Sequence, residues 1–397
     1  MGVYDGRNSA DFAVLPPRSG PVGVTRLALT DFRNYHSARL DLAPGPVVLT
    51  GPNGAGKTHL LEAVSVLSPG RGLRNARLGD FDRRCGEDDS DAAGWAVAAT
   101  VETRRGPVKI GTGRDPAGGE RRVVRIDGET ARGQAALGEV IGVTWLTPQM
   151  DRLFIEGPSA RRRFLDRLVL GLDPAHAARV SAYEHAIRER SRLLRDNPSD
   201  ATWLDAIEET MAAHGVAVAA ARRYAVERLD EACATAEGPF PRARLKLIGT
   251  VEDWLDELPA LAAEDRFRAA LRGGRATDAA AGGATTGPHR SDLAVTNAEK
   301  GAPAETMSTG EQKALLISIV LAHAQLQRQT RGEPPLLLLD EVAAHLDAAR
   351  REALFSALLQ LESQVWLTGT DTALFASLRA AARFLSVSDG ALSETTF

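Results

Sequence analysis

The sequence is poor in cysteine and contains no long apolar run. Its two cysteines, Cys85 and Cys233, stand far apart in a chain of 397 residues. They cannot form a disulfide framework or a zinc site, so we expect both to be reduced. No apolar stretch approaches the ~20 residues that span a bilayer, and residues 1–23 lack the basic start and apolar core of a secretory signal. These absences predict a cytoplasmic protein, and the glycine, proline and serine content of residues 1–23 predicts a loose N-terminal tail.

An excess of positive charge is also missing. The 48 basic and 52 acidic residues give a net charge of −4, so any DNA contact must come from local patches rather than from a global field. Aromatic residues make up only 5% of the chain, and no stretch resembles a helix-turn-helix or an aromatic platform for bases. Sequence-specific base reading is therefore not expected.

A phosphate-binding loop is the first motif that is present. "GPNGAGKT" matches G-x-x-x-x-G-K-[ST], follows a strand-like run and opens a helical pattern, which is the context that distinguishes a P-loop from a chance glycine-rich turn. In such a loop, backbone N–H groups and the helix dipole face phosphate oxygens. We expect Lys57 to reach the β- and γ-phosphates and Thr58 to bind Mg²⁺. The predicted nucleotide-binding residues are Gly51, Pro52, Asn53, Gly54, Ala55, Gly56, Lys57 and Thr58.

A second motif, "LLLLDE" at residues 336–341, predicts the partner of this loop. Four consecutive leucines fit a strand that is buried on both faces. Asp340 at its end is placed to hold Mg²⁺, and Glu341 is placed to polarise an attacking water. Two acids at the end of a buried strand are costly without a nearby cation, which disfavours a plain solvated turn.

The order of the predicted elements indicates an α/β domain that is interrupted by a helical insert. Short alternating apolar runs over residues 94–147 predict a β-meander. Helices alternate with buried strands from residue 311 onward, as in a parallel sheet. Between them, apolar residues recur at spacings of 3, 4 and 7 in residues 174–196 and again in residues 204–218, which predicts a short antiparallel helical hairpin. Residues 270–290, rich in glycine and alanine, read as a linker that closes the insert.

Three stretches together resemble the ABC-type ATPase heads: "LTGPNGAGKTHLLEAV", "MSTGEQKALLISIVLA" and "LLLLDEVAAHLD". The separation of 283 residues between Lys57 and Asp340 leaves room only for a short insert. The stretches "LALTDFRNYHSARLDLAPG", "WLTPQMDRLFIEGPSARRRFLDRLV" and "GPHRSDL" are similar to the RecF family of DNA replication and repair ATPases. This resemblance covers about residues 24–395.

The resemblance implies an ABC-type ATPase head, made of a parallel sheet with the P-loop plus an antiparallel β subdomain, with an inserted helical lobe. The expected boundaries are a tail at 1–23, head at 24–150, lobe at 151–284 and head at 285–397. In this family the signature loop caps the γ-phosphate held by a second chain, so two loops in one chain imply an ATP-dependent homodimer. Further ATP contacts are implied for Arg33, Asn34, Ser308, Gly310, Glu311 and Asp347.

The same resemblance implies a function in recombinational repair. The expected protein is a slow, DNA-stimulated ATPase whose ATP-bound dimer clamps duplex or gapped DNA. It would act with RecO and RecR to place RecA on single-stranded DNA and would take part in the SOS response. Gln149, in "TPQM", is the candidate for sensing Mg²⁺ and the attacking water, although a plain loop glutamine fits equally well.

A basic stretch marks the expected DNA contact. Residues 159–196 contain nine arginines against five acids, a net charge of +4 within a negative chain. Arginine forks suit phosphate oxygens, whereas a solvated helix face is the alternative interpretation. The candidate DNA-binding residues are Arg161, Arg162, Arg163, His289 and Arg290; the last two have the alternative role of holding the base of the insert.

Two other interpretations stay open at this point. Thr370 stands where many ABC-type heads have a histidine, and a hydroxyl cannot carry charge, which favours slow turnover or a scaffold that binds ATP without hydrolysing it. Another SMC-like ATPase head is the second alternative. The intact pair Asp340–Glu341 opposes the scaffold.

Overall fold

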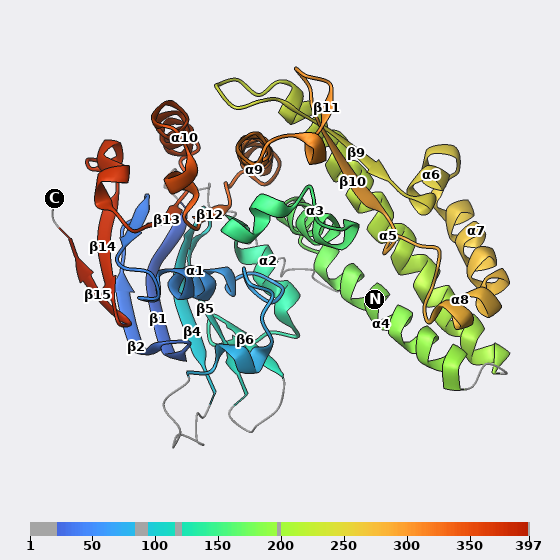
Figure 1. Ribbon diagram of the computed structural model, residues 1–397. Helices are drawn as coiled ribbons and strands as arrows, with labels where there is room; N and C mark the ends of the chain where they lie inside the picture. The colour runs from blue at the N-terminus through green and yellow to red at the C-terminus, as the bar shows by residue number, and fades with distance from the viewer. Residues whose placement is uncertain (1–21, 84–93, 116–120, 197–199, 396–397) are drawn as a thin grey trace, which may run out of the picture.

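A computed structural model describes residues 22–83, 94–115, 121–196 and 200–395. The expected tail lies almost entirely outside these residues, as does Cys85. Figure 1 shows two bodies: a head that contains the larger sheets, and a helical lobe built around one long helix, α5. The lobe leaves the head after β8 (Val143–Leu146) and returns before α9 (Thr309–Arg331), so it is an insertion between two halves of the head.

A six-stranded sheet forms the centre of the head, in the order β15-β14-β3-β13-β12-β8. All neighbours pair in parallel except β15, which pairs antiparallel at the edge. Every residue of β3, β8, β12 and β13 is buried, as the apolar runs of β12 and β13 predicted. Strand β8 was expected within the β-meander of residues 94–147, but it pairs in parallel with β12 in this sheet. The strands are β3 (Val47–Thr50), β8 (Val143–Leu146), β12 (Leu336–Leu339), β13 (Val365–Gly369), β14 (Arg383–Ser388) and β15 (Ala391–Glu394).

The four leucines of β12 show how this sheet is covered on both faces. Leu336 and Leu338 lie in a core shared with α1 and the antiparallel strands, whereas Leu337 and Leu339 lie in a core shared with α3, α9 and α10. Successive strand residues point to opposite faces, so an unbroken apolar run is what a two-sided core requires. The helices of the head are α1 (Lys57–Ser65), α2 (Leu137–Val140), α9 (Thr309–Arg331) and α10 (Ala348–Gln360).

Most of the predicted β-meander, β4 to β7, forms a second sheet with β1 and β2, in the order β2-β1-β4-β5-β6-β7. Its strands alternate between buried and exposed residues, as in β4, because one face packs on the core. Gln364 beside β13 joins this sheet to the central one: its side chain accepts from the N–H of Val24 at 2.8 Å and donates to its carbonyl at 2.9 Å. The strands are β1 (Gly23–Phe32), β2 (Tyr35–Asp41), β4 (Ala96–Thr103), β5 (Gly106–Arg114), β6 (Arg122–Ile126) and β7 (Glu129–Thr130).

The lobe contains the predicted helical hairpin and a small sheet. Helices α4 and α5 pack together, with Tyr183 and Met211 buried in their shared core. Strands β9 and β10 pair antiparallel and lie along α5 (Figure 1). The elements are α3 (Pro158–Leu172), α4 (His176–Asp196), α5 (Ala201–Ala234), α6 (Thr250–Glu257), α7 (Ala260–Gly273), α8 (Arg275–Ala281), β9 (Ala243–Ile248), β10 (Asp292–Asn297) and β11 (Ala302–Pro303).

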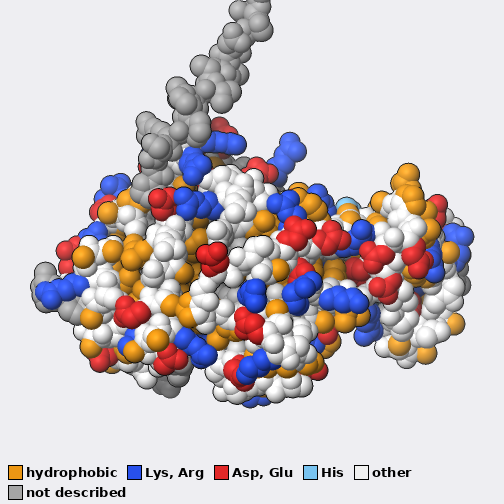
Figure 2. All heavy atoms as spheres, turned by 90° about the horizontal axis from the view of Figure 1, so that it is seen from above, with side chains coloured by type: hydrophobic (Ala, Val, Ile, Leu, Met, Phe, Trp, Pro, Cys, Tyr) orange, Lys and Arg blue, Asp and Glu red, His pale blue; other side chains and the backbone are white. Residues whose placement is uncertain are grey.

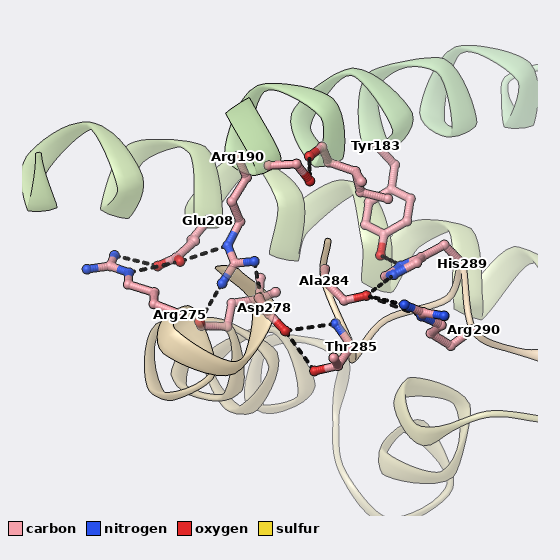
Figure 3. A network of polar contacts seen from close by, with 12 residues as sticks. Tyr183, Arg190, Glu208, Arg275, Asp278, Ala284, Thr285, His289 and Arg290 are labelled. Atoms are coloured by element: carbon pink, nitrogen blue, oxygen red, sulfur yellow. Dashed lines mark hydrogen bonds and ion pairs between the residues drawn. The ribbon is translucent and has the colours of Figure 1, made fainter. Parts of the chain in front are cut away.

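The expected linker at residues 270–290 is wrong for its first half, which continues α7 and then forms α8. A buried ionic network, seen in Figure 3, explains the difference. Arg190 of α4 is 1% exposed and pairs with Glu208 of α5 at 2.9 Å and Asp278 of α8 at 2.7 Å. Buried charges are stable only when they are paired, so this arginine holds α8 against the hairpin despite its glycine-rich surroundings.

The domain boundaries stay a prediction, and the small sheet crosses one of them. Strand β10, at 292–297, pairs with β9 of the lobe over six residue pairs, although it follows the expected boundary at 284. Cys233 is buried and free. Among the described residues, no helix combines the length and hydropathy that crossing a membrane would require.

Acid should weaken the junction of lobe and head through His323 of α9. Its Nε2 donates to the carbonyl oxygen of Leu168 in α3 at 2.8 Å, and burial lowers its pKa from 6.5 to about 4. A lowered pKa means that its contribution is full above pH 6.5 and falls as the pH approaches 4. Between pH 7.5 and 5, the free energy of unfolding should fall about 2 kcal/mol more for the wild type than for His323→Gln. Urea denaturation at both pH values measures this, and equal losses would contradict it.

Candidate functional site

The loop between β3 and α1 has the conformation that its glycines predict. Gly51, Gly54 and Gly56 have φ angles of 147°, 82° and 112°, a region that side chains with a Cβ rarely adopt. A Cβ on Gly51 would lie 2.2 Å from the carbonyl oxygen of Val387, whereas nothing lies within 4 Å of one on Gly54. The loop delivers the chain to the amino end of α1, where no side chain caps the backbone N–H groups. These N–H groups are therefore available to an anion.

Lys57 lies folded against its own loop. Its Nζ donates to the carbonyl oxygens of Gly51 at 2.7 Å and Pro52 at 2.9 Å, and the residue is 4% exposed. Burial lowers its pKa, while the carboxylates of Glu341 and Asp340 oppose that shift. The ammonium is thus a buried donor at the centre of the loop, and an anionic oxygen can replace the two carbonyl oxygens to which it donates.

Thr58 and Asp340 meet although they are separated by 282 residues. The Thr58 hydroxyl lies 3.1 Å from each carboxylate oxygen of Asp340, to which it donates. Asp340 is 6% exposed, and burial raises its pKa because the charged form loses hydration. A hydroxyl and a buried carboxylate are oxygen ligands of the kind that Mg²⁺ prefers, so this pair fits a divalent cation.

Thr368 of β13 fixes the two acids, and sequence reasoning missed it. Its hydroxyl donates to Asp340 Oδ1 at 2.8 Å and accepts from the backbone N–H of Glu341 at 2.8 Å. Glu341 has a φ of 54°, a left-handed conformation that costs a non-glycine residue about 1–3 kcal/mol. This left-handed conformation turns the backbone at Glu341 away from the extended direction of β12. The signal for this role is a threonine in the strand beside β12. The sequence does not show that β13 is that neighbouring strand, because the fold decides which strands pair.

A cleft of about 240 Å³ opens where these groups meet. It brings the candidate Gln149 together with Thr58, Asp340 and Glu341. It also contains Arg74, an exposed residue that sequence reasoning missed and whose positive charge partly opposes the rise in the pKa of Asp340 that burial causes. The lining residues are Thr58, Leu73, Arg74, Thr147, Pro148, Gln149, Asp340 and Glu341.

Arg33 and Asn34 lie beside the loop but do not share one role. Arg33 forms a two-pronged ion pair with the fully buried Glu62 of α1, at 2.7 and 2.8 Å. Its guanidinium is therefore occupied within the chain. Asn34 donates to the carbonyl oxygen of Ala55 at 3.1 Å and contacts His59 at 2.7 Å, so it supports the P-loop from behind.

The predicted signature residues lie outside this cleft. Ser308 caps the amino end of α9, and Ser308, Gly310 and the intervening Thr309 are exposed. Within the described part of the chain, neither they nor Glu311 line the cleft that holds Asp340. Asp347 is also exposed and caps α10 by accepting from the N–H of Arg350 at 2.8 Å.

The five candidate DNA-binding residues are mostly engaged within the lobe. Arg161 pairs with Asp292 at 2.7 and 2.8 Å, and Arg162 donates to the carbonyl oxygen of Ser291 at 2.8 Å. Arg163 is exposed, and its one described contact is a long hydrogen bond to Ser159 at 3.4 Å. The net charge of +4 counted for residues 159–196 therefore exceeds the positive charge that this stretch presents to DNA.

His289 and Arg290 belong to the network of Figure 3. His289 Nε2 donates to the carbonyl oxygen of Ala284 at 2.8 Å, so Nδ1 of the neutral ring accepts from the Tyr183 hydroxyl at 2.9 Å. Arg290 donates to the same carbonyl at 3.1 Å but remains exposed. The alternative interpretation, that these residues hold the base of the insert, fits His289 well.

A family model described as the RecF/RecN/SMC N terminal domain matches residues 23–392. The DNA replication and repair protein RecF of Mesorhizobium japonicum is 52% identical over 378 residues, which cover 94% of this chain and 98% of that protein. RecF of Brucella suis biovar 1 is 49% identical, covering 94% and 97%.

The chain belongs to the RecF family. The solved structure of the recombination mediator protein RecF-ATPrS in the RecFOR pathway superimposes with a TM-score of 0.82, covering 95% of this chain and 99% of that one, at 21% identity. The likeness confirms the expected fold class, an ABC-type ATPase head with an inserted helical lobe.

Two glycine variants should separate steric conflict from simple backbone strain in the P-loop. Gly51→Ala should lower the free energy of unfolding by about 3 kcal/mol, because its Cβ meets the backbone of β14. Gly54→Ala should cost about 1–2 kcal/mol, since only its left-handed φ is unfavourable. Thermal denaturation compares the two. Equal destabilisation would contradict the assigned close approach at Gly51.

Proposed function

We propose that this RecF-family protein binds and hydrolyses ATP with Mg²⁺, and that two copies close on DNA when ATP is bound. The observation that carries the proposal is the convergence of Thr58, Asp340, Thr368 and Glu341 at the mouth of the P-loop. The related structures named RecF-ATPrS and RecF-ATP support a nucleotide in this loop. Mg²⁺, when bound, would neutralise phosphate charge next to Thr58 and Asp340.

The groups around the cleft divide the chemistry between them. Glu341 would accept a proton from the water that attacks the γ-phosphorus, while the bond from that phosphorus to the β-phosphate oxygen breaks and releases ADP. Lys57 would exchange its carbonyl partners for phosphate oxygens and stabilise the charge that develops there. Gln149 lines the same cleft and would orient the water. Thr370, exposed just after β13, offers a hydroxyl but no charge, which supports slow turnover.

A second copy of the chain would supply the other half of the site. Ser308 and Gly310 are exposed at the amino end of a 23-residue helix, where backbone N–H groups attract an anion. They do not line their own cleft, so a phosphate held by another copy is the ligand that they suit. Asp347, exposed at the start of α10, would lie near the same contact.

DNA would then lie across the closed dimer through few, non-specific phosphate contacts. Arg163 and Arg290 are the exposed members of the predicted set. On the face in Figure 2, acidic and basic side chains are interspersed, so that face alone offers no extended positive field. Pairing of two copies is what would assemble enough basic surface. By family membership we assign the protein to gap repair with RecO and RecR, upstream of RecA.

Glu341→Gln should separate closure from hydrolysis. Removal of the proton acceptor should slow phosphate release about 100-fold or more, whereas ATP still binds. Light scattering with ATP and Mg²⁺ should show a longer-lived dimer and stronger retention of DNA. Unchanged phosphate release would remove Glu341 from its assigned role.

Ser308→Arg is the matched control for closure. It should bind nucleotide normally in its own P-loop but remain monomeric with ATP, because the long cation blocks the interface. If the wild type also remains monomeric with ATP and with DNA, the composite site does not form. The scaffold alternative then becomes the better description.

Neighbouring arginines of α3 should respond differently to truncation. Arg163→Ala should weaken DNA binding and lower the salt slope by about 1, with no change in stability, because it removes one phosphate contact. Arg161→Ala should lower the free energy of unfolding by about 2 kcal/mol, because the Asp292 carboxylate in β10 then loses both hydrogen bonds from Arg161. Fluorescence anisotropy over a salt series and thermal denaturation provide the readouts. An Arg163→Ala variant with wild-type affinity and slope would exclude this residue from the DNA surface.

A further inference from the structure

The amino end of α9 is occupied by a charge from its own chain. Glu311 accepts from the backbone N–H of Ser308 at 3.0 Å and from the Ser308 hydroxyl at 2.7 Å. In return, the N–H of Glu311 points to the Ser308 oxygen at 3.4 Å. This capping box stabilises the helix start. It also places a carboxylate beside the groups that would receive a phosphate from a second copy.

That carboxylate creates an electrostatic conflict. The hydroxyl of Ser308 has a single proton, and Glu311 holds it. A γ-phosphate that approaches the helix would meet a like charge only a few ångströms away, which opposes binding. The pKa of Glu311 lies at about 2, mainly because of its hydrogen bond to Lys300, so the carboxylate stays charged near neutral pH.

Lys300 offsets this charge from outside the helix. Its Nζ forms an ion pair with Glu311 Oε1, the oxygen that Ser308 does not use. Lys300 lies in the turn between β10 and β11, which no nucleotide motif includes. The ion pair therefore joins α9, the signature helix that begins at the signature residues 308–312, to the small sheet of the lobe.

The turn that carries Lys300 is fixed by a buried side chain. Asn297 is 2% exposed, and its Oδ1 accepts from the N–H groups of Glu299 at 2.9 Å and Lys300 at 3.0 Å. Gly301 completes the turn with a φ of 62° and donates to the Asn297 carbonyl at 2.9 Å. The position of the Lys300 backbone is thus set by the turn and does not depend on the exposed ion pair.

We propose that Lys300 is a positioning residue for the composite ATP site. By neutralising Glu311, it allows Ser308 and the N–H groups of α9 to accept the γ-phosphate of an ATP molecule held by a second copy of this chain. The Ser308 hydroxyl keeps its proton and turns its hydrogen bond from Glu311 to a phosphate oxygen, while Glu311 keeps its hydrogen bond from the Ser308 N–H. This inference rests on the proposed function, because it presupposes ATP-dependent pairing.

A double-mutant cycle tests the inference on the full-length chain. Light scattering over a protein concentration series gives the dimer dissociation constant with Mg²⁺ and a non-hydrolysable ATP analogue. Lys300→Met should raise that constant about tenfold, the size of ordinary coupling between contacting charges. Lys300→Arg should stay within about threefold of the wild type, since it keeps the charge. In a Glu311→Gln background, Lys300→Met should have no further effect.

Two controls complete the experiment. Lys246→Met removes an exposed lysine from β9, in the same small sheet, and should leave the dimer unchanged. Binding of a fluorescent ATP analogue to each monomer should match the wild type, which shows that the P-loop and fold are intact. A variant with a merely disturbed turn would not be rescued by Glu311→Gln.

The outcomes separate this inference from the proposed function. If the wild type does not dimerise with nucleotide, the proposed function fails first. If it dimerises and Lys300→Met does so equally well, the role of Lys300 is refuted. If Lys300→Met still weakens pairing in the Glu311→Gln background, Lys300 acts directly on the phosphate or through the turn and not through Glu311, which also overturns the proposal.

Discussion

The buried carboxylate of Asp340 is the constraint on which the site depends. It ends β12, accepts from Thr58 at the start of α1, and accepts from Thr368 in β13. Three elements that are far apart in sequence therefore meet at one carboxylate. Because a buried charge must be hydrogen-bonded or paired, these contacts fix the carboxyl edge of the parallel sheet, and with it the P-loop and the position of Glu341.

In the lobe, too, buried charges join elements that are far apart in the sequence. Arg190, Glu208 and Asp278 bind three helices through charges that are almost completely buried. Removing one partner from such a network costs more than the network contributes, so it specifies one arrangement of α4, α5 and α8. The same lobe reaches the signature helix through Lys300, and α3 reaches it through the contact of His323 with Leu168. The lobe is thus connected to the part of the head that would meet a second copy.

Surface charge was the least predictable property. Arg161, Arg162 and His289 were candidates for DNA because their residue types and clustering suit phosphate. The structure uses them to hold β10 and the base of the lobe. A sequence gives the number of charges in a stretch but does not give their partners, since Asp292 and Ser291 lie about 130 positions away from these arginines.

The sequence by itself determined the P-loop, the doubly buried strands, the meander and the helical hairpin, because each follows from local periodicity or from a short motif whose glycines the backbone requires. It also placed Asp340 and Glu341 beside the loop, through their position after a buried strand, whereas Gln149 was a candidate from family resemblance that the structure brings into the same cleft. Only the tertiary structure decided the roles of Thr368, Arg74 and Lys300. It also decided that Arg161 and Arg162 bind partners within the chain. These depend on which strands are neighbours and on which side chains meet across long separations, and no local pattern encodes either.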